Sequence, residues 1–342
     1  MNDAVINTQV EHGGALAKAC AEFGGEPGEW LDLSTGINPN PVPLPNIDRT
    51  VWARLPDEDL FERASKAAAD CYGTASGVRP LAVAGTQSVI QLLPGIFGGN
   101  VAIFGPTYEE YRSRFQMAGR SVDLISDVDE ISGDHRLVIL INPNNPDGRI
   151  VPREAIAALA ERLADRDAYL VVDEAFADLH PEESVAGLAG EIGNLVVFRS
   201  FGKFFGLAGL RLGFVLAAPA IIRKMREGQG PWAVSGPALA LAHAILTNGR
   251  LCGRTKEQIV QRRSALGSVL SEAGLSITGG TQLFALVEDD RAIQLHRQLC
   301  ERHILTRKFG YEPRWLRIGL CADENGDRRL SNALAEIMPS LR

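Results

Sequence analysis

The residues with the clearest chemical potential lie in one Gly-rich stretch, from Ser200 to Gly213. It follows an apolar run typical of a buried strand, residues 194–198, and its four glycines permit close approach of a ligand. Lys203 stands among three phenylalanines, surroundings that lower the pKa of a lysine amine and free it to attack a carbonyl. Arg211 and Ser200 are side chains that bind phosphate. Local chemistry alone supports equally a phosphate site with a reactive lysine and an ordinary loop with a solvated one.

Two further segments place polar or aromatic residues directly after predicted strands. Gly85-Thr86-Gln87 follows the apolar run 81–84 and opens a helical pattern over residues 86–97, where unpaired backbone N–H groups favour an anion. Taken alone, Thr86 is more simply an ordinary N-cap. Tyr108 follows the next predicted strand, and its ring suits stacking on a flat ligand, although a half-buried core tyrosine is the commoner case.

Two more candidates follow the next apolar runs. Asn145 lies in the segment 142–148, Asn-Pro-Asn-Asn-Pro-Asp-Gly, whose composition alone explains a turn. Asp173 ends the apolar run 169–173, and a buried carboxylate there requires a positively charged partner. A protonated pyridine nitrogen is such a partner. Glu174 is the rival carboxylate for this role.

Together these segments resemble the class I/II aminotransferases, which are pyridoxal 5'-phosphate (PLP) enzymes of fold type I. The likeness rests on Ser-x-x-Lys-x-x-Gly-Leu-x-Gly-x-Arg-x-Gly and on Asn-Pro-x-Asn-Pro-Thr-Gly, from which only Asp147 departs, and it runs from about His12 to the C-terminus. It implies PLP as the cofactor, with Lys203 as the Schiff-base lysine and Asp173 at the ring nitrogen as the catalytic residues. The cofactor-binding residues that it implies are Gly85, Thr86, Gln87, Tyr108, Asn145, Asp173, Ser200, Lys203 and Arg211.

The same resemblance implies a substrate with two anionic groups. Arg317 occupies the place of the family's carboxylate-binding arginine, which leaves Arg307 for a second anion such as a phosphate. His12-Gly13-Gly14, and Phe176 where transaminases commonly have Tyr, resemble the branch of the family that decarboxylates L-threonine O-3-phosphate in cobalamin biosynthesis. The substrate-binding residues so implied are His12, Gly13, Asn38, Asn145, Arg307 and Arg317.

The resemblance therefore predicts PLP-dependent decarboxylation of a small phosphorylated amino acid, L-threonine O-3-phosphate. Transamination of the histidinol-phosphate type is the alternative, because both reactions use the same cofactor set. A non-catalytic PLP-fold sensor is a third class, disfavoured because the catalytic set is complete and no DNA-binding extension is fused. The family also implies a homodimer, although Leu55 stands where relatives have a tyrosine that reaches the cofactor phosphate of the neighbouring subunit.

The elements that must position these residues follow from hydrophobic patterning. Continuous apolar runs alternate with helical patterns between residues 57 and 198, which predicts an α/β fold whose mostly parallel sheet is covered by helices. Five prolines between residues 39 and 56 predict an extended arm. Beyond residue 219, mixed helices and strands predict a smaller α/β or α+β domain. The predicted division is an N-terminal arm packing with the small domain (1–47), a large PLP-binding domain (48–247) and a small C-terminal domain (248–342).

Composition limits the possible classes of function. With 342 residues, 45% hydrophobic and 23% charged, the chain has the composition of a soluble globular protein. Its net charge of −7 disfavours binding to nucleic acid or to anionic membranes. The five cysteines form no Cys-x-x-Cys pair, so we predict reduced thiols and no metal site. No signal peptide or membrane-spanning run of ~18 apolar residues is apparent, and a cytoplasmic location is predicted.

Overall fold

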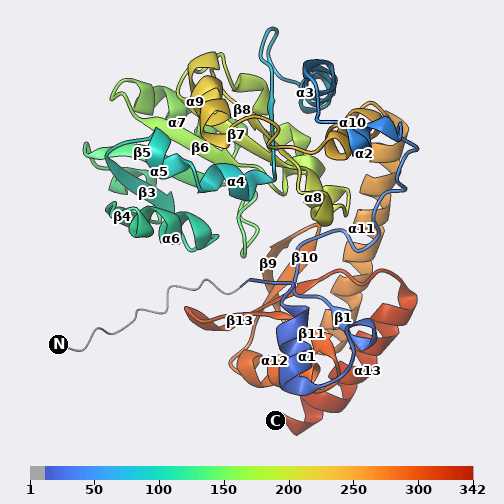
Figure 1. Cartoon of the computed structure of the whole chain (residues 1–342). Coiled ribbons are helices and arrows are strands. Elements are labelled where there is room, and N and C mark those ends of the chain that lie inside the picture. Colours follow the sequence, from blue (N-terminus) through green and yellow to red (C-terminus); the bar gives the residue numbers. More distant parts are fainter. Residues whose placement is uncertain (1–11, 342) are drawn as a thin grey trace, which may run out of the picture.

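The computed structural model describes residues 12–341, so residues 1–11 of the predicted N-terminal arm lie outside the described residues. Within the described range, the largest sheet has seven strands (Figure 1). Their spatial order is β2 (Leu81–Val83), β8 (Gly213–Leu216), β7 (Leu195–Ser200), β6 (Tyr169–Asp173), β5 (His135–Ile141), β3 (Asn100–Phe104) and β4 (Val122–Ile125). Strands β3 to β7 pair in parallel, whereas β8 runs antiparallel to both neighbours. The predicted α/β fold class with a mostly parallel sheet is confirmed.

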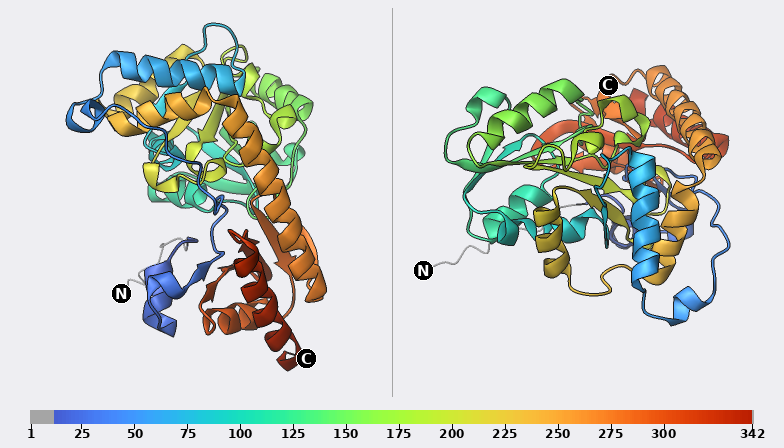
Figure 2. Two further views of the ribbon diagram at one scale, coloured as in Figure 1. Left: turned by 90° about the vertical axis from the view of Figure 1, so that its right-hand side faces the viewer. Right: turned by 90° about the horizontal axis from the view of Figure 1, so that it is seen from above.

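Helices cover both faces of this sheet (Figure 2), because its central strands are apolar on both sides. One face packs against α3 (Glu58–Tyr72), α7 (Arg153–Ala164) and α10 (Gly236–Leu246). The other packs against α4 (Thr86–Ile90), α5 (Leu93–Ile96), α6 (Glu110–Met117) and α9 (Pro219–Gln229). The prediction of one helix over residues 86–97 is wrong: the segment forms α4 and α5, and Pro94 lacks the N–H that would continue the ladder.

A second, antiparallel sheet lies below the first in Figure 1. Its order is β12 (Arg307–Phe309), β13 (Glu312–Gly319), β10 (Phe284–Glu288) and β9 (Ile277–Thr281), accompanied by α12 (Ala292–Cys300) and α13 (Glu324–Ser340). Helix α11 (Gly249–Glu272) runs along one side of the molecule, from α10 to the small sheet. Neither α11 nor any other helix within residues 12–341 is long and apolar enough to cross a membrane.

The N-terminal segment connects the two sheets. After α1 (Leu16–Phe23), β1 (Leu31–Asp32) pairs in parallel with β11 (Ile304–Leu305) on the small-sheet side. The Pro-rich segment then passes the Lys203 region, where the backbone N–H of Asn38 donates to the Lys203 carbonyl at 3.0 Å. Gly206 has a φ of +69°, and a Cβ there would lie 2.7 Å from the Asn38 carbonyl oxygen. Only glycine therefore lets this segment approach, before the chain enters α2 (Thr50–Ala53).

Candidate active site

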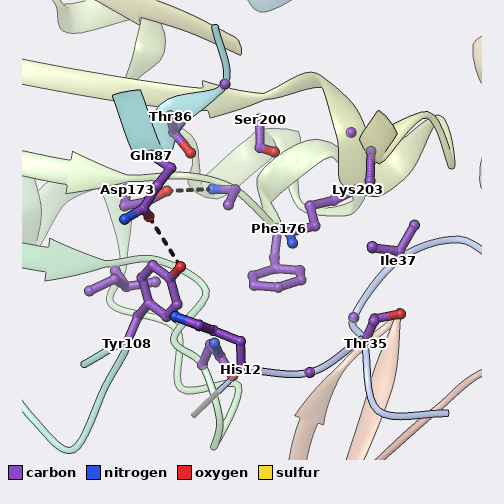
Figure 3. Close-up of a pocket in the computed structure, with 18 of the residues that line it drawn as sticks. His12, Thr35, Ile37, Thr86, Gln87, Tyr108, Asp173, Phe176, Ser200 and Lys203 are labelled. Carbon is purple, nitrogen blue, oxygen red and sulfur yellow. Dashed lines mark hydrogen bonds between the residues drawn. The ribbon is translucent and has the colours of Figure 1, made fainter. Parts of the chain in front are cut away.

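A cavity of about 540 Å³ lies between the carboxyl ends of β6 and β7 and the small sheet (Figure 3). Its volume suits an organic cofactor together with a small substrate. Parallel strands end at one edge of their sheet, which explains why residues distant in sequence meet here. The predicted residues that line the cavity are His12, Gly13, Gly85, Thr86, Gln87, Tyr108, Asn145, Asp173, Ser200, Lys203, Arg211, Arg307 and Arg317.

Lys203 lies in the short helix α8 (Phe201–Phe204), which begins directly after β7. Burial lowers the pKa of its amine to about 8, and the positive charge of Arg317 acts in the same direction, while Asp173 opposes it. The amine lies 6.0 Å from the centre of the Phe176 ring, and Figure 3 shows both side chains at the cavity. At a pKa of about 8, a minor fraction of this amine is neutral at pH 7, and that fraction is a nucleophile.

Asp173 ends β6 and is 4% exposed. Burial raises the pKa of its carboxyl to about 6, while hydrogen bonds from the Tyr111 hydroxyl and the Ala175 N–H, and the charge of Lys203, act against the rise. The neighbouring Glu174 is fully buried and forms an ion pair with Arg199 at 2.9 Å, so it is committed elsewhere. Of these two carboxylates, Asp173 is the one that lines the cavity.

Four residues form a cradle suited to a phosphate: Gly85, Thr86, Ser200 and Arg211. Arg211 adopts a left-handed backbone conformation, with a φ of +52°. A Cβ at Gly85, whose φ is +76°, would lie 2.7 Å from Nη2 of Arg211. Glycine at position 85 therefore lets the guanidinium reach the start of α4, where Thr86 lies.

A chain of hydrogen bonds runs along one wall. The Tyr108 hydroxyl donates to Oε1 of Gln87 at 3.1 Å, and Nε2 of Gln87 donates to Oε2 of Glu110 at 2.6 Å. The other oxygen of Glu110 lies 2.8 Å from Nε2 of His12. The chain ties the N-terminal segment to α6, and it holds His12 at the cavity.

Arg317 and Arg307 lie on adjacent strands of the small sheet, directly opposite each other in register. Arg317 donates to Oδ1 of Asn145 at 2.6 Å and to the carbonyl of Ser34 at 2.7 Å, while its buried Nε has no acceptor within residues 12–341. Burial, followed by the charge of Arg307, lowers the pKa of Arg317 to about 10, so it is charged at neutral pH. A Cβ at Gly13 would lie 2.2 Å from the Ser34 oxygen, which explains the glycine there.

Comparison with known proteins assigns the family. The family model described as aminotransferase class I and II matches residues 30–334. The chain belongs to the aminotransferase class I and II family. It is 52% identical to a threonine-phosphate decarboxylase of a Sinorhizobium species, over 97% of this chain and 99% of the relative. It is 40% identical to a threonine-phosphate decarboxylase of Pseudomonas aeruginosa, over 95% and 97%. The histidinol-phosphate aminotransferase of Sinorhizobium meliloti, solved with PLP, superposes with a TM-score of 0.76 at 20% identity, covering 100% of this chain and 99% of that one.

Class I and II aminotransferases use PLP, and the residues present fit it. Asp173 accepts hydrogen bonds only from neutral groups, the Tyr111 hydroxyl and the Ala175 N–H, among the residues that the structure describes. A lone buried carboxylate of this kind suits a protonated ring nitrogen. The Lys203 amine suits the aldehyde, and the cradle around Arg211 suits the phosphate.

One predicted member of this class I and II site lies apart from the rest. Asn38 is 2% exposed; its amide donates to the Phe204 carbonyl at 3.0 Å and its oxygen accepts from the Asn40 N–H at 3.0 Å. Its neighbour Ile37 lines the cavity instead. Asn38 shapes the segment that passes Lys203, and its side chain does not line the cavity.

Sequence reasoning missed Tyr111, Glu110 and Tyr311. Tyr111 lies directly against Asp173, Glu110 holds His12, and Tyr311 lines the cavity near Arg307. The spacing of Tyr108 and Tyr111, three residues apart at a helix start, was a usable signal because such residues lie on one face. Glu110 and Tyr311 carry no comparable local signature.

Proposed function

We propose that this chain is a PLP-dependent decarboxylase that converts L-threonine O-3-phosphate to (R)-1-amino-2-propanol O-phosphate. The two related threonine-phosphate decarboxylases support the substrate class, since they match nearly the full length of this chain. The observation that carries the proposal is the facing pair of Arg307 and Arg317 at the cavity. A guanidinium group binds a carboxylate or a phosphate through two parallel hydrogen bonds. Two of them at one cavity therefore suit a small substrate that carries both a carboxylate and a phosphate.

The residues divide the work between cofactor and substrate. When bound, PLP provides a conjugated ring that accepts the electron pair left at the substrate Cα. Asp173 keeps the ring nitrogen protonated, while Ser200, Arg211 and the segment Gly85–Gln87 hold the cofactor phosphate. Tyr108 would stack on the ring, and Asn145, fixed by Arg317, would hydrogen-bond the ring oxygen.

The substrate side selects the bond that breaks. Arg317 binds the carboxylate and Arg307, helped by His12 and Gly13, binds the phosphate, so the two anions are held at separate places. Phe176 stands where transaminases commonly have Tyr, so it has no hydroxyl to hydrogen-bond the ring oxygen. The Lys203 amine can return a proton to Cα after carbon dioxide leaves.

The deciding experiment is a product assay with L-threonine O-3-phosphate. We expect carbon dioxide and an amino-alcohol phosphate in equal amounts, without an added keto-acid acceptor. Formation of a keto acid that depends on such an acceptor would contradict the proposal and would support transamination, the reaction for which the histidinol-phosphate aminotransferases are named.

We further propose a homodimer. Four large apolar side chains, Leu44, Trp52, Leu55 and Trp232, are each more than half exposed, on the Pro-rich segment, α2 and the approach to α10. Helix α2 packs against α10, and Gly236 at the start of α10 lies beside Val51, so these exposed apolar groups suit burial against a second copy. Sedimentation should give a dimer, and Trp52→Glu should shift it to monomer; an active monomer of the unsubstituted protein would contradict the proposal.

We also propose that the chain divides after residues 47 and 247 into the arm, the large domain and the small domain. The pairing of β1 with β11 supports packing of the arm with the small C-terminal part. Limited proteolysis that cuts near residue 48 and near residue 248, leaving the fragments between intact, is the expected result.

A further inference from the structure

Tyr111 is a fully buried residue of α6 whose hydroxyl makes one hydrogen bond among the residues that the structure describes. Its hydroxyl donates a hydrogen bond to Oδ2 of Asp173 at 2.8 Å. Its ring packs in the apolar layer between α6 and the seven-stranded sheet, and Tyr111 does not appear among the residues that line the cavity. It therefore touches Asp173 from the protein interior and leaves the cavity side of that carboxylate free.

The start of α6 places Tyr111 there. Tyr108 and Tyr111 are three residues apart, and their rings meet edge to face with centroids 6.3 Å apart. Tyr108 lines the cavity while Tyr111 lies behind it, so one short segment supplies both a wall residue and a support for Asp173. The Ala175 N–H donates to the other oxygen, Oδ1, at 3.1 Å. Both carboxylate oxygens are thereby fixed, and the orientation of the carboxylate is set before any ligand arrives.

We propose that Tyr111 is a positioning residue for the cofactor: its hydroxyl keeps the carboxylate of Asp173 oriented and ionised so that it can face the ring nitrogen. This inference rests on the proposed PLP-dependent function, because it assigns to Tyr111 a role that acts through Asp173. Tyr111 lies outside every sequence motif described above.

The electrostatics of the site support this role. Burial raises the pKa of Asp173 to about 6, which would leave much of the carboxyl neutral in mildly acidic solution. The hydrogen bond from Tyr111 is the largest effect that opposes this rise; the Ala175 N–H and the charge of Lys203 add to it, while Glu174 works against it. Burial also raises the pKa of the Tyr111 phenol well above its usual value, with Asp173 and Tyr108 adding to the rise, so the hydroxyl keeps its proton and remains a donor.

The test compares PLP affinity of the full chain, freed of cofactor, before and after Tyr111→Phe. Loss of a hydrogen bond to a charged group raises the pKa of Asp173, so the variant loses its ionised carboxylate at a higher pH than the parent does. We expect affinity about 5–50-fold weaker than the parent at pH 6 and within about twofold of it at pH 8. A role in packing alone would give the same ratio at both pH values.

Tyr72→Phe is the matched control. The Tyr72 hydroxyl is buried and has no hydrogen-bond partner within residues 12–341, and the residue lies in α3, away from the cavity. Its removal should leave PLP affinity unchanged at both pH values. In an Asp173→Asn background, Tyr111→Phe should lose its pH-dependent effect, because no carboxylate remains to respond.

Each outcome decides the inference. A Tyr111→Phe ratio that does not change with pH overturns it, and so does a cofactor-free Tyr111→Phe protein that fails to fold, since the hydroxyl would then serve the fold. Absence of PLP binding by the unsubstituted protein at both pH values would overturn the proposed function itself, which separates the two failures.

Discussion

The floor of the cavity and its rim differ in how their charges are balanced. The floor, made of Asp173, Ser200, Lys203 and Arg211, combines a carboxylate with cations, and Asp173 and Lys203 each moderate the pKa of the other. The rim, made of His12, Arg307 and Arg317, brings two guanidinium groups and an imidazole together, and Arg317 donates only to neutral oxygens among the described residues. The floor is suited to a ligand that carries both signs of charge, whereas the rim is suited to anions.

This difference indicates that the floor holds the cofactor, whereas the rim selects the substrate. A protonated ring nitrogen and a phosphate on one cofactor match the mixed charges of the floor. Two anionic groups on one substrate match the rim, so changes there should alter which substrate is used while leaving the cofactor in place. Substitutions on the two sides should therefore have different signatures.

The largest effect is expected on the floor. Lys203→Ala should lower turnover by about 10³-fold or more, because it removes the nucleophilic amine and its proton transfer together. Reduction of the unsubstituted protein with borohydride should fix PLP on a peptide that contains Lys203. The variant should still bind PLP without a covalent bond, as measured by dialysis.

Lys224→Ala is the matched control, because Lys224 lies exposed on α9. It should retain full activity. Recovery of the reduced cofactor on any lysine other than Lys203 would show that the floor has been assigned wrongly.

The same contrast explains how much could be predicted from sequence. Asp173 and Ser200 end apolar strands, and Lys203 lies three residues after Ser200, so the local pattern by itself predicts that these three lie at one sheet edge. The short strand β8 was not predicted, because its four residues follow the Gly-rich stretch. It pairs with the preceding strand β7 and also with β2, which is far away in sequence.

The rim depends on contacts that no local pattern records. Arg307 and Arg317 were predicted as anion partners, but their direct opposition arises from a strand pairing with an irregularity after Lys308. Asn38 was predicted to bind the substrate, but its side-chain amide donates a hydrogen bond to the backbone carbonyl of Phe204. Glu110 holds His12 only because the N-terminal segment returns to α6, a contact between residues about a hundred positions apart.

The rim should produce the next largest effect. Arg307→Ala should weaken use of L-threonine O-3-phosphate by roughly tenfold or more, since charge-assisted hydrogen bonds contribute on the order of 1.5–3 kcal/mol. Unphosphorylated threonine lacks the group in question, so kcat/KM for it should change little. Arg317→Ala should harm both substrates alike.

Arg314→Ala provides the control on the same small sheet. Arg314 is exposed on β13, where it pairs with Glu288 and Asp290 outside the cavity. It should leave both substrates unaffected. Equal losses for the two substrates in Arg307→Ala would mean that Arg307 does not recognise phosphate.

A third effect, about tenfold, concerns pH and belongs to the floor. The pKa of Lys203 is lowered to about 8, so its amine is mostly protonated at pH 7 and mostly neutral at pH 9. Because only the neutral amine attacks the aldehyde, covalent capture of PLP should speed up about tenfold from pH 7 to pH 9 and then level off. Mixing the cofactor-free chain with PLP and following the absorbance by stopped flow measures the rate of this capture. A rate that keeps rising beyond pH 10 would indicate an amine with an ordinary pKa.

The smallest effect tests the rim through two neighbouring carboxylates. Glu110 pairs with His12 and lies outside the cavity lining, whereas Glu109 lines the cavity itself. Glu110→Gln should raise KM for L-threonine O-3-phosphate about two- to fivefold, because the partly exposed contact between Glu110 and His12 contributes up to about 1 kcal/mol and its loss releases His12. Glu109→Gln should instead lower KM by a similar factor, since it removes a negative charge that repels the anionic substrate. Neither change should alter PLP affinity, because neither carboxylate belongs to the floor and the amide oxygen introduced at position 110 can still accept from Gln87. Changes of the same sign in both variants would show that the rim responds only to the total charge nearby, and the proposed role of His12 would then have to be abandoned.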